Sequence, residues 1–115
     1  MPPPKKLILT LAGEAKEYQS SRGGTYILSD DDPVNGYPYW LKKTDESQAI
    51  WYDIVYPSWT IGPKEVLGTS TGGIFGPKGI DAYPNEIKRG WRFSDNDGVW
   101  DAGPNDVIFK VLGAL

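Results

Sequence analysis

Cysteine and histidine are both missing from this sequence of 115 residues. Without cysteine the chain forms no disulfide and offers no thiolate, either as a nucleophile or as a zinc ligand. Without histidine it lacks the side chain that most often transfers protons near neutral pH. Hydrolases that depend on a Ser–His or Cys–His pair are therefore excluded.

The sequence also lacks long apolar runs and any concentration of positive charge. No segment approaches the roughly 20 apolar residues that span a bilayer, and the first six residues do not resemble a secretory signal. Twelve basic residues face 15 acidic ones, for a net charge of −3, and the basic ones occur as scattered pairs such as Lys42 and Lys43. A phosphate backbone requires a concentrated basic face. We therefore expect neither membrane insertion nor nucleic-acid binding.

The residues that are present predict one small all-β domain. A chain of this length holds one core rather than two, so we expect a single domain over residues 6–115 after a flexible, proline-rich lead-in at 1–5. With 14 glycines and 10 prolines, the chain is divided into short β-branched and aromatic runs. These strand-length runs are Lys6–Leu11, Thr25–Leu28, Tyr37–Leu41, Ala49–Ile54, Trp59–Ile61, Ile87–Phe93 and Val107–Leu112. Only Gly13–Ser20 has the composition of a short helix.

Turn residues between these runs predict successive hairpins. Asn35-Gly36 tolerates the positive φ that a two-residue type I′ turn requires. Tyr56-Pro57-Ser58 and the stretch from Asp95 to Gly98 predict two further turns. The fold class we expect is a small antiparallel barrel or sandwich whose first and last runs, Lys6–Leu11 and Val107–Leu112, lie in the core sheet.

The stretch from Gly62 to Asn85 lacks strand periodicity and is expected to form a long loop. Loops of more than about 12 residues in compact domains are usually functional or mobile, so a binding site is first sought here. From Gly68 to Gly79 the glycines do not match a P-loop, because the only lysine there, Lys78, stands between Pro77 and Gly79. Gly73, Gly76 and Gly79 do not match the dinucleotide-binding spacing either. We expect no cofactor.

The acidic residues are concentrated where turns require them. Asp95, Asp97 and Asp101 lie close together, but an EF-hand loop would need an acidic residue at the position of Phe93. Paired carboxylates also act as acid and base in glycosidases. Glu86 and Asp53, together with the three aspartates above, are the candidates for such a pair. Turn formation explains the same aspartates without catalysis or metal binding. We therefore expect no metal site and no enzyme, and a carboxylate hydrolase is only a remote alternative.

Aromatic residues make up 13% of the chain, including five tryptophans. Side chains alternate between the two faces of a strand, so Tyr37, Tyr39 and Leu41 are expected on one face and Trp40 on the other. Trp51 must likewise point away from its neighbour in sequence. A large aromatic ring is then exposed unless the protein covers both faces of its sheet. Exposed Tyr and Trp rings are typical of sugar-binding platforms and of protein interfaces.

Several of these motifs together resemble a small aromatic-rich β module that recurs in large multidomain eukaryotic proteins. The motifs are, in order, Gly24-Thr25-Tyr26, Asn35-Gly36-Tyr37-Pro38-Tyr39-Trp40, Ile50-Trp51-Tyr52, Trp59-Thr60-Ile61-Gly62, and Trp91 with Trp100-Asp101. The resemblance covers about Gly24 to Leu112. It implies a shared fold and a repeated, noncatalytic use, and it identifies no ligand.

Two binding functions follow as hypotheses, with a protein or a glycan as the partner. The first is a noncatalytic protein-interaction module within a larger protein or assembly, in which replacing Trp40 with alanine weakens partner binding without unfolding the domain. Its expected contact surface is formed by Tyr37, Tyr39, Trp40, Tyr52 and the loop from Gly62 to Asn85. The second is a carbohydrate-binding module, in which Trp40, Trp59 or Trp100 forms a stacking platform and the neighbouring aspartates bind hydroxyl groups. The candidate binding residues are Tyr37, Tyr39, Trp40, Tyr52, Trp59, Phe75, Asp95, Asp97, Trp100 and Asp101.

Overall fold

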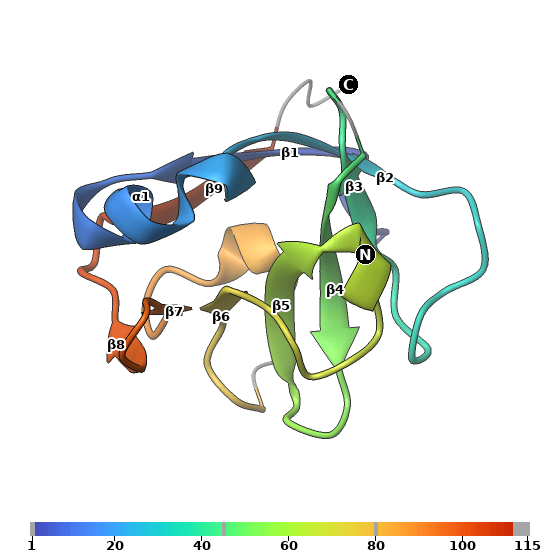
Figure 1. Ribbon diagram of the computed structural model, residues 1–115. Coiled ribbons are helices and arrows are strands. Elements are labelled where there is room, and N and C mark those ends of the chain that lie inside the picture. The colour runs from blue at the N-terminus through green and yellow to red at the C-terminus, as the bar shows by residue number, and fades with distance from the viewer. Residues whose placement is uncertain (1, 45, 80, 112–115) are drawn as a thin grey trace.

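The computed structural model describes residues 2–44, 46–79 and 81–111, and it is almost entirely antiparallel β. The strands are β1 (Lys6–Leu11), β2 (Gly24–Leu28), β3 (Trp40–Lys42), β4 (Gln48–Asp53), β5 (Ser58–Pro63), β6 (Ile74–Phe75), β7 (Arg92–Ser94), β8 (Val99–Asp101) and β9 (Val107–Val111). They form one sheet that curls into a half-barrel (Figure 1). The predicted all-β, barrel-like fold is confirmed.

The strand order is that of a meander with one crossover. Strands β1 to β8 pair in sequence order, and β9 returns to pair with β1, which gives the order β8-β7-β6-β5-β4-β3-β2-β1-β9. The first and last strands are thus neighbours, with Leu9 opposite Phe109. Their predicted place in the core sheet is confirmed for the described residues, which end one residue before Leu112.

The concave face of the sheet holds the main core. Its largest fully buried side chains include Trp40, Tyr26 and Phe93. The short helix α1 (Gly13–Gln19), predicted from composition, packs against β7 and buries Ala15. A 3₁₀ turn, η3 (Pro84–Glu86), packs against β9 on the concave side (Figure 1). Ala15 of α1 and Pro84 of η3 are therefore buried in the interior of the half-barrel.

The convex face of the sheet is also covered by other residues in the region of strands β3 to β5. There Trp51 and Tyr39 pack with Val66 and Leu67, which lie in or directly after a second 3₁₀ turn, η2 (Lys64–Val66). The Trp51 indole N–H donates a hydrogen bond to the carbonyl oxygen of Thr69 (2.9 Å). Five consecutive residues of β4 are therefore buried. Both faces are covered here, so the large residues on opposite faces of β4 need not be exposed.

Three predicted segments differ from the structure for local reasons. The run from Tyr37 becomes a strand only at Trp40, because Tyr37 closes a tight turn with Val34. The run from Ile87 becomes a strand only at Arg92, because Gly90 has a φ of +85° and turns the chain. The predicted loop from Gly62 to Asn85 contains the short strand β6 and two 3₁₀ turns, with Ile80 outside the described residues.

A polar contact set joins helix α1 to the far side of the half-barrel. The Gln19 side-chain amide donates to the carbonyl oxygen of Ser94 in β7 (2.5 Å), and the Arg22 guanidinium donates to Gln19 Oε1 (2.6 Å) and to Gln48 Oε1. Burial lowers the pKa of Arg22, and the neighbouring Tyr26 partly offsets that effect. Through α1 and the following 3₁₀ turn η1 (Ser20–Arg22), these hydrogen bonds connect β4 with β7, which are separated by β5 and β6 in the sheet.

Candidate binding cleft

A cleft of about 750 Å³ lies beside β4 and β5. Its volume lies in the range typical of ligand pockets. Its walls come from three segments: the Asn35-Gly36 turn, the facing strands β4 and β5, and the stretch that leads into η3. The lining residues are Gly36, Tyr37, Pro38, Tyr52, Trp59, Gly79, Asp81, Ala82, Tyr83 and Glu86.

The Asn35-Gly36 turn positions the first wall. Both residues have positive φ (57° and 81°), and Val34 and Tyr37 exchange two backbone hydrogen bonds across them, as the sequence predicts. The Asn35 side-chain amide donates to the carbonyl oxygens of Tyr52 (2.8 Å) and Gly68 (3.2 Å). The turn is therefore fixed to β4, and it holds the Tyr37 ring over the cleft.

The opposite wall is fixed to β5 by backbone contacts. The N–H groups of Gly76 and Gly79 donate to the carbonyl oxygens of Trp59 and Pro57 (2.8 Å each). The Trp59 indole N–H donates to the carbonyl oxygen of Ala82 (2.6 Å). Where the wall enters η3, the Tyr83 N–H donates to Glu86 Oε1 (2.8 Å), which caps the 3₁₀ turn. Both cleft walls are thus held at several points.

Four aromatic rings form the floor and sides of the cleft. Tyr37 lies on Tyr52 with ring centroids 4.2 Å apart, and both rings meet Trp59 edge-on, at 6.2 and 5.3 Å. Tyr83 contacts Trp59 from the other side of the cleft lining, at 6.5 Å. Tyr52 and Trp59 are 8% and 2% exposed, whereas Tyr37 is 40% exposed. The cleft therefore has a largely buried aromatic floor, and Tyr37 is the most exposed of its four rings.

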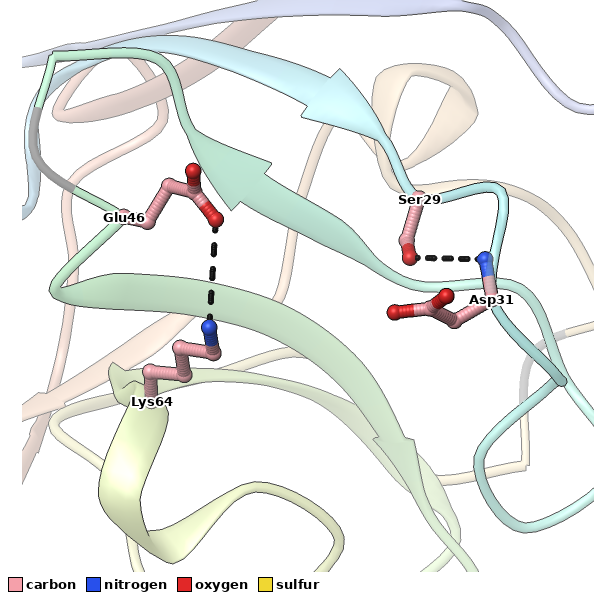
Figure 2. A network of polar contacts seen from close by, with 4 residues as sticks. All are labelled: Ser29, Asp31, Glu46 and Lys64. Atoms are coloured by element: carbon pink, nitrogen blue, oxygen red, sulfur yellow. Dashed lines mark hydrogen bonds and ion pairs between the residues drawn. The ribbon is translucent and has the colours of Figure 1, made fainter.

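The charge of the cleft is negative. Asp81 and Glu86 are its only charged lining residues. Within the described ranges the single ion pair joins Lys64 to Glu46 (3.8 Å; Figure 2). Neither residue is among those that line the cleft. The Asp81 and Glu86 carboxylates therefore form no ion pair with any lysine or arginine of the described residues.

Two further observations define the electrostatics around the cleft. Burial raises the pKa of Tyr52, with smaller contributions from Tyr37 and the nearby Asp81 carboxylate. The closest lysine in sequence, Lys78, has its ammonium group 5.2 Å from the centre of the Tyr56 ring, outside the cleft lining. The Asp81 carboxylate thus contributes to the raised pKa of Tyr52, and Lys78 does not lie in the cleft lining beside it.

The structure brings together only some of the candidate residues named from the sequence. Tyr37, Tyr52 and Trp59 share the cleft. Tyr39 and Trp40 are 7% and 0% exposed, on the convex and concave faces respectively. The expectation that they form a contact surface is wrong for both, because each fills a core cluster. Phe75 lies in β6, opposite Arg92 and outside the cleft lining.

The expected faces of the Tyr37–Leu41 run need a similar correction. Tyr39 and Leu41 share the convex face and Trp40 lies on the concave face, as alternation predicts. Tyr37 does not share the face of Tyr39, since it stacks on Tyr52 of the main core. Alternation fails at Tyr37 because that residue lies in a turn, not in the strand.

The remaining candidates lie on the hairpin of β7 and β8. Asp95 Oδ1 accepts hydrogen bonds from the N–H groups of Asp97 (2.7 Å) and Gly98 (2.9 Å), which closes the predicted turn. The Asp97 N–H is the main cause of the lowered pKa of Asp95, and the Trp100 side chain adds to the effect. Asp101 lies opposite Arg92 in the register of the two strands. None of these aspartates lines the cleft.

The five tryptophans are divided sharply by exposure. Trp40, Trp51, Trp59 and Trp91 are at most 3% exposed, whereas Trp100 is 52% exposed. Trp40 and Trp59 therefore present no ring face for stacking on a sugar, which corrects that part of the carbohydrate hypothesis.

We expect acrylamide to quench one class of tryptophan strongly, and Trp100→Phe to remove that class while the other four remain protected. Stern–Volmer plots of the natural chain and the variant measure this difference. A second strongly quenched tryptophan in Trp100→Phe would contradict the burial of the aromatic core.

The sequence analysis places the stretch that contains Asp81 and Tyr83 on the same contact surface as Tyr37, but it does not single out these two residues. The stretch that contains them was singled out as a long loop, but its pairing with β5 is not encoded by periodicity. Tyr83-Pro84 followed by Glu86 is a start signal for a helical turn, because proline favours the first helical position and Glu86 caps it. That signal could have predicted that Tyr83 lies at the start of an ordered turn and not in an irregular loop.

No group of three or more metal-binding side chains is found in residues 2–44, 46–79 and 81–111. Over the same residues, no helix is long and apolar enough to cross a membrane. The chain matches no protein-family model, and comparison with curated proteins and with solved structures finds no significant similarity.

Proposed function

We propose that the protein is a noncatalytic interaction module whose cleft between Tyr37 and Tyr83 binds a segment of a partner protein. The observation that carries the proposal is the aromatic floor of the cleft, beside which lie two carboxylates that form no ion pair among the described residues. Tyrosine and tryptophan dominate the energetics of protein interfaces, and a prearranged site loses little conformational entropy on binding. The resemblance to a recurrent noncatalytic module is in agreement with this function.

Glycan binding is a second candidate, supported by Trp100. Its ring is half exposed on the edge strand β8, and the aspartates of the same hairpin could accept hydrogen bonds from sugar hydroxyls. A flat indole with neighbouring hydrogen-bonding groups is suited to stacking on a sugar ring. This candidate uses a surface separate from the cleft, so the two functions can be tested with different variants.

The proposed function predicts that peptides selected on the protein depend on Tyr37. A random peptide library displayed on phage would be selected against the immobilised chain, and the selected peptides titrated into natural and variant proteins. Tyr37→Ala removes the accessible ring of the cleft, and we expect it to weaken binding at least tenfold, as loss of a buried aromatic anchor commonly does.

Tyr56→Ala is the matched control, because Tyr56 is a similarly exposed tyrosine (51%) outside the cleft. Circular dichroism of both variants verifies that they remain folded. Selected peptides that bind Tyr37→Ala as tightly as the natural chain would refute the cleft as the site. A glycan that binds the natural chain but not Trp100→Phe would support the second candidate instead.

A further inference from the structure

We propose that the cleft recognises an extended, proline-containing peptide that carries basic residues. This inference rests on the proposed function and specifies its ligand. Three properties of the cleft point to it: the arrangement of its rings, the free hydroxyl donors above them, and its unneutralised negative charge.

The rings favour a proline-containing chain over a flat ligand. Tyr52 and Trp59 are almost wholly buried, and Tyr37 covers the Tyr52 ring at 4.2 Å. The floor therefore offers no open indole face on which a sugar could stack. It offers aromatic edges and the side of Tyr37, next to Pro38. Aromatic-lined grooves of this kind bind the ridged surface of a polyproline II helix, whose conformation is largely preformed.

The hydroxyl groups of the cleft complement an extended peptide backbone. A polyproline II segment makes no internal hydrogen bonds, so its carbonyl oxygens need donors from the partner. The hydroxyls of Tyr37 and Tyr52 have no hydrogen-bond partner among the described residues. The Trp59 N–H is already bound to Ala82 and is not available. The two tyrosine hydroxyls are therefore the donors that the cleft presents to peptide carbonyls.

The charge of the cleft selects basic side chains beside the prolines. Asp81 and Glu86 lie in the lining, and no Lys or Arg does. Neither carboxylate belongs to the ion pair that the described residues form. A lysine or arginine of the ligand would supply the missing cation. An exposed ion pair of this kind contributes modestly to the binding free energy, and its contribution decreases as the salt concentration rises. A neutral glycan would leave this charge unused.

Synthetic peptides separate these contributions. The reference is a ten-residue peptide of prolines with two lysines near one end; one variant has alanine for every proline, and another has glutamate for both lysines. Each is titrated into the full ¹⁵N-labelled chain and followed by NMR. We expect the reference peptide to shift the resonances of the cleft residues, and each variant peptide to bind at least tenfold more weakly.

Protein variants locate the binding. We expect Asp81→Asn to weaken binding of the reference peptide about threefold and to reduce its salt dependence. Asp97→Asn changes an exposed carboxylate of the β7–β8 turn and should leave binding unchanged. Tyr37→Phe keeps the ring and removes the hydroxyl, so it should weaken binding several-fold with no loss of stability.

Two results would overturn the ligand assignment. One is equal affinity for the lysine and glutamate peptides, or for the proline and alanine peptides. The other is a set of library-selected peptides that require Tyr37 but contain neither proline nor basic residues. That second result would leave the proposed function intact. Selected peptides that bind Tyr37→Ala as tightly as the natural chain would refute both the proposed function and the ligand assignment.

Discussion

Replacing Trp40 with alanine is expected to lower the free energy of unfolding by about 3–5 kcal/mol, as truncation of a fully buried tryptophan generally does. The Trp40 side chain is 0% exposed and packs edge-on against Trp59 with ring centroids 5.5 Å apart. Its indole N–H also donates to the carbonyl oxygen of Pro4 (2.8 Å). The substitution removes the aromatic volume beneath the cleft and the bond that holds the segment before β1. Equilibrium unfolding in urea measures the loss.

Trp100→Ala is the matched control for Trp40→Ala. It removes the same side chain from an edge strand where half of the ring is already exposed, so we expect a loss of about 1 kcal/mol or less. If Trp40→Ala kept the stability of the natural chain and weakened only peptide binding, Trp40 would belong to a contact surface, as the sequence alone predicts.

Gly72→Ala is expected to destabilise the protein by about 1–3 kcal/mol, the usual cost of overfilling a packed site. A Cβ atom at this position would overlap the Thr60 methyl group and lie 3.0 Å from the carbonyl oxygen of Ile61. Thr60 is fully buried in β5, so its side chain cannot move aside. A Cβ atom added at Gly62 would likewise lie only 2.9 Å from the Cα atom of Gly72. The close approach of these two backbones therefore requires glycine.

Gly98→Ala is the control for this backbone approach. No atom lies within 4 Å of a Cβ at Gly98, and its φ is outside the positive region. Its stability should remain within about 0.5 kcal/mol of the natural chain. Thermal and urea unfolding of the two variants, measured side by side, check the difference. Equal stabilities would mean that the loop carrying Gly72 can move away from β5 at little cost.

The strands were predictable where short-range patterns determine them. Lys6–Leu11 alternates regularly and forms β1 with those bounds, and Asn35-Gly36 forms the expected tight turn because both residues accept positive φ. Ile74–Phe75 could not be recognised as a strand. Its two residues pair with β5 and β7 only because the curled sheet brings those strands to either side.

The candidate site was predictable only in part, because exposure depends on what covers each face. Alternation along β4 correctly places Trp51 and Tyr52 on opposite faces. The sequence does not reveal that residues after β5 return to cover Trp51 through Val66 and Leu67. Tyr83 and Asp81 reach the cleft by the same kind of return, across hydrogen bonds to β5. Such long-range contacts leave no periodic signal in the chain.

The pairing of the first and last strands determines how the folded unit would respond to force. Leu7 lies opposite Val111, so the two ends of the described fold are neighbours on adjacent antiparallel strands. Tension applied through these ends would act along the direction of the hydrogen bonds between β1 and β9, which are perpendicular to the strands. The bonds would then break one after another, as in a zipper, and not all together. In a chain under tension, this module would therefore unfold at low force, beginning with the separation of β9 from β1.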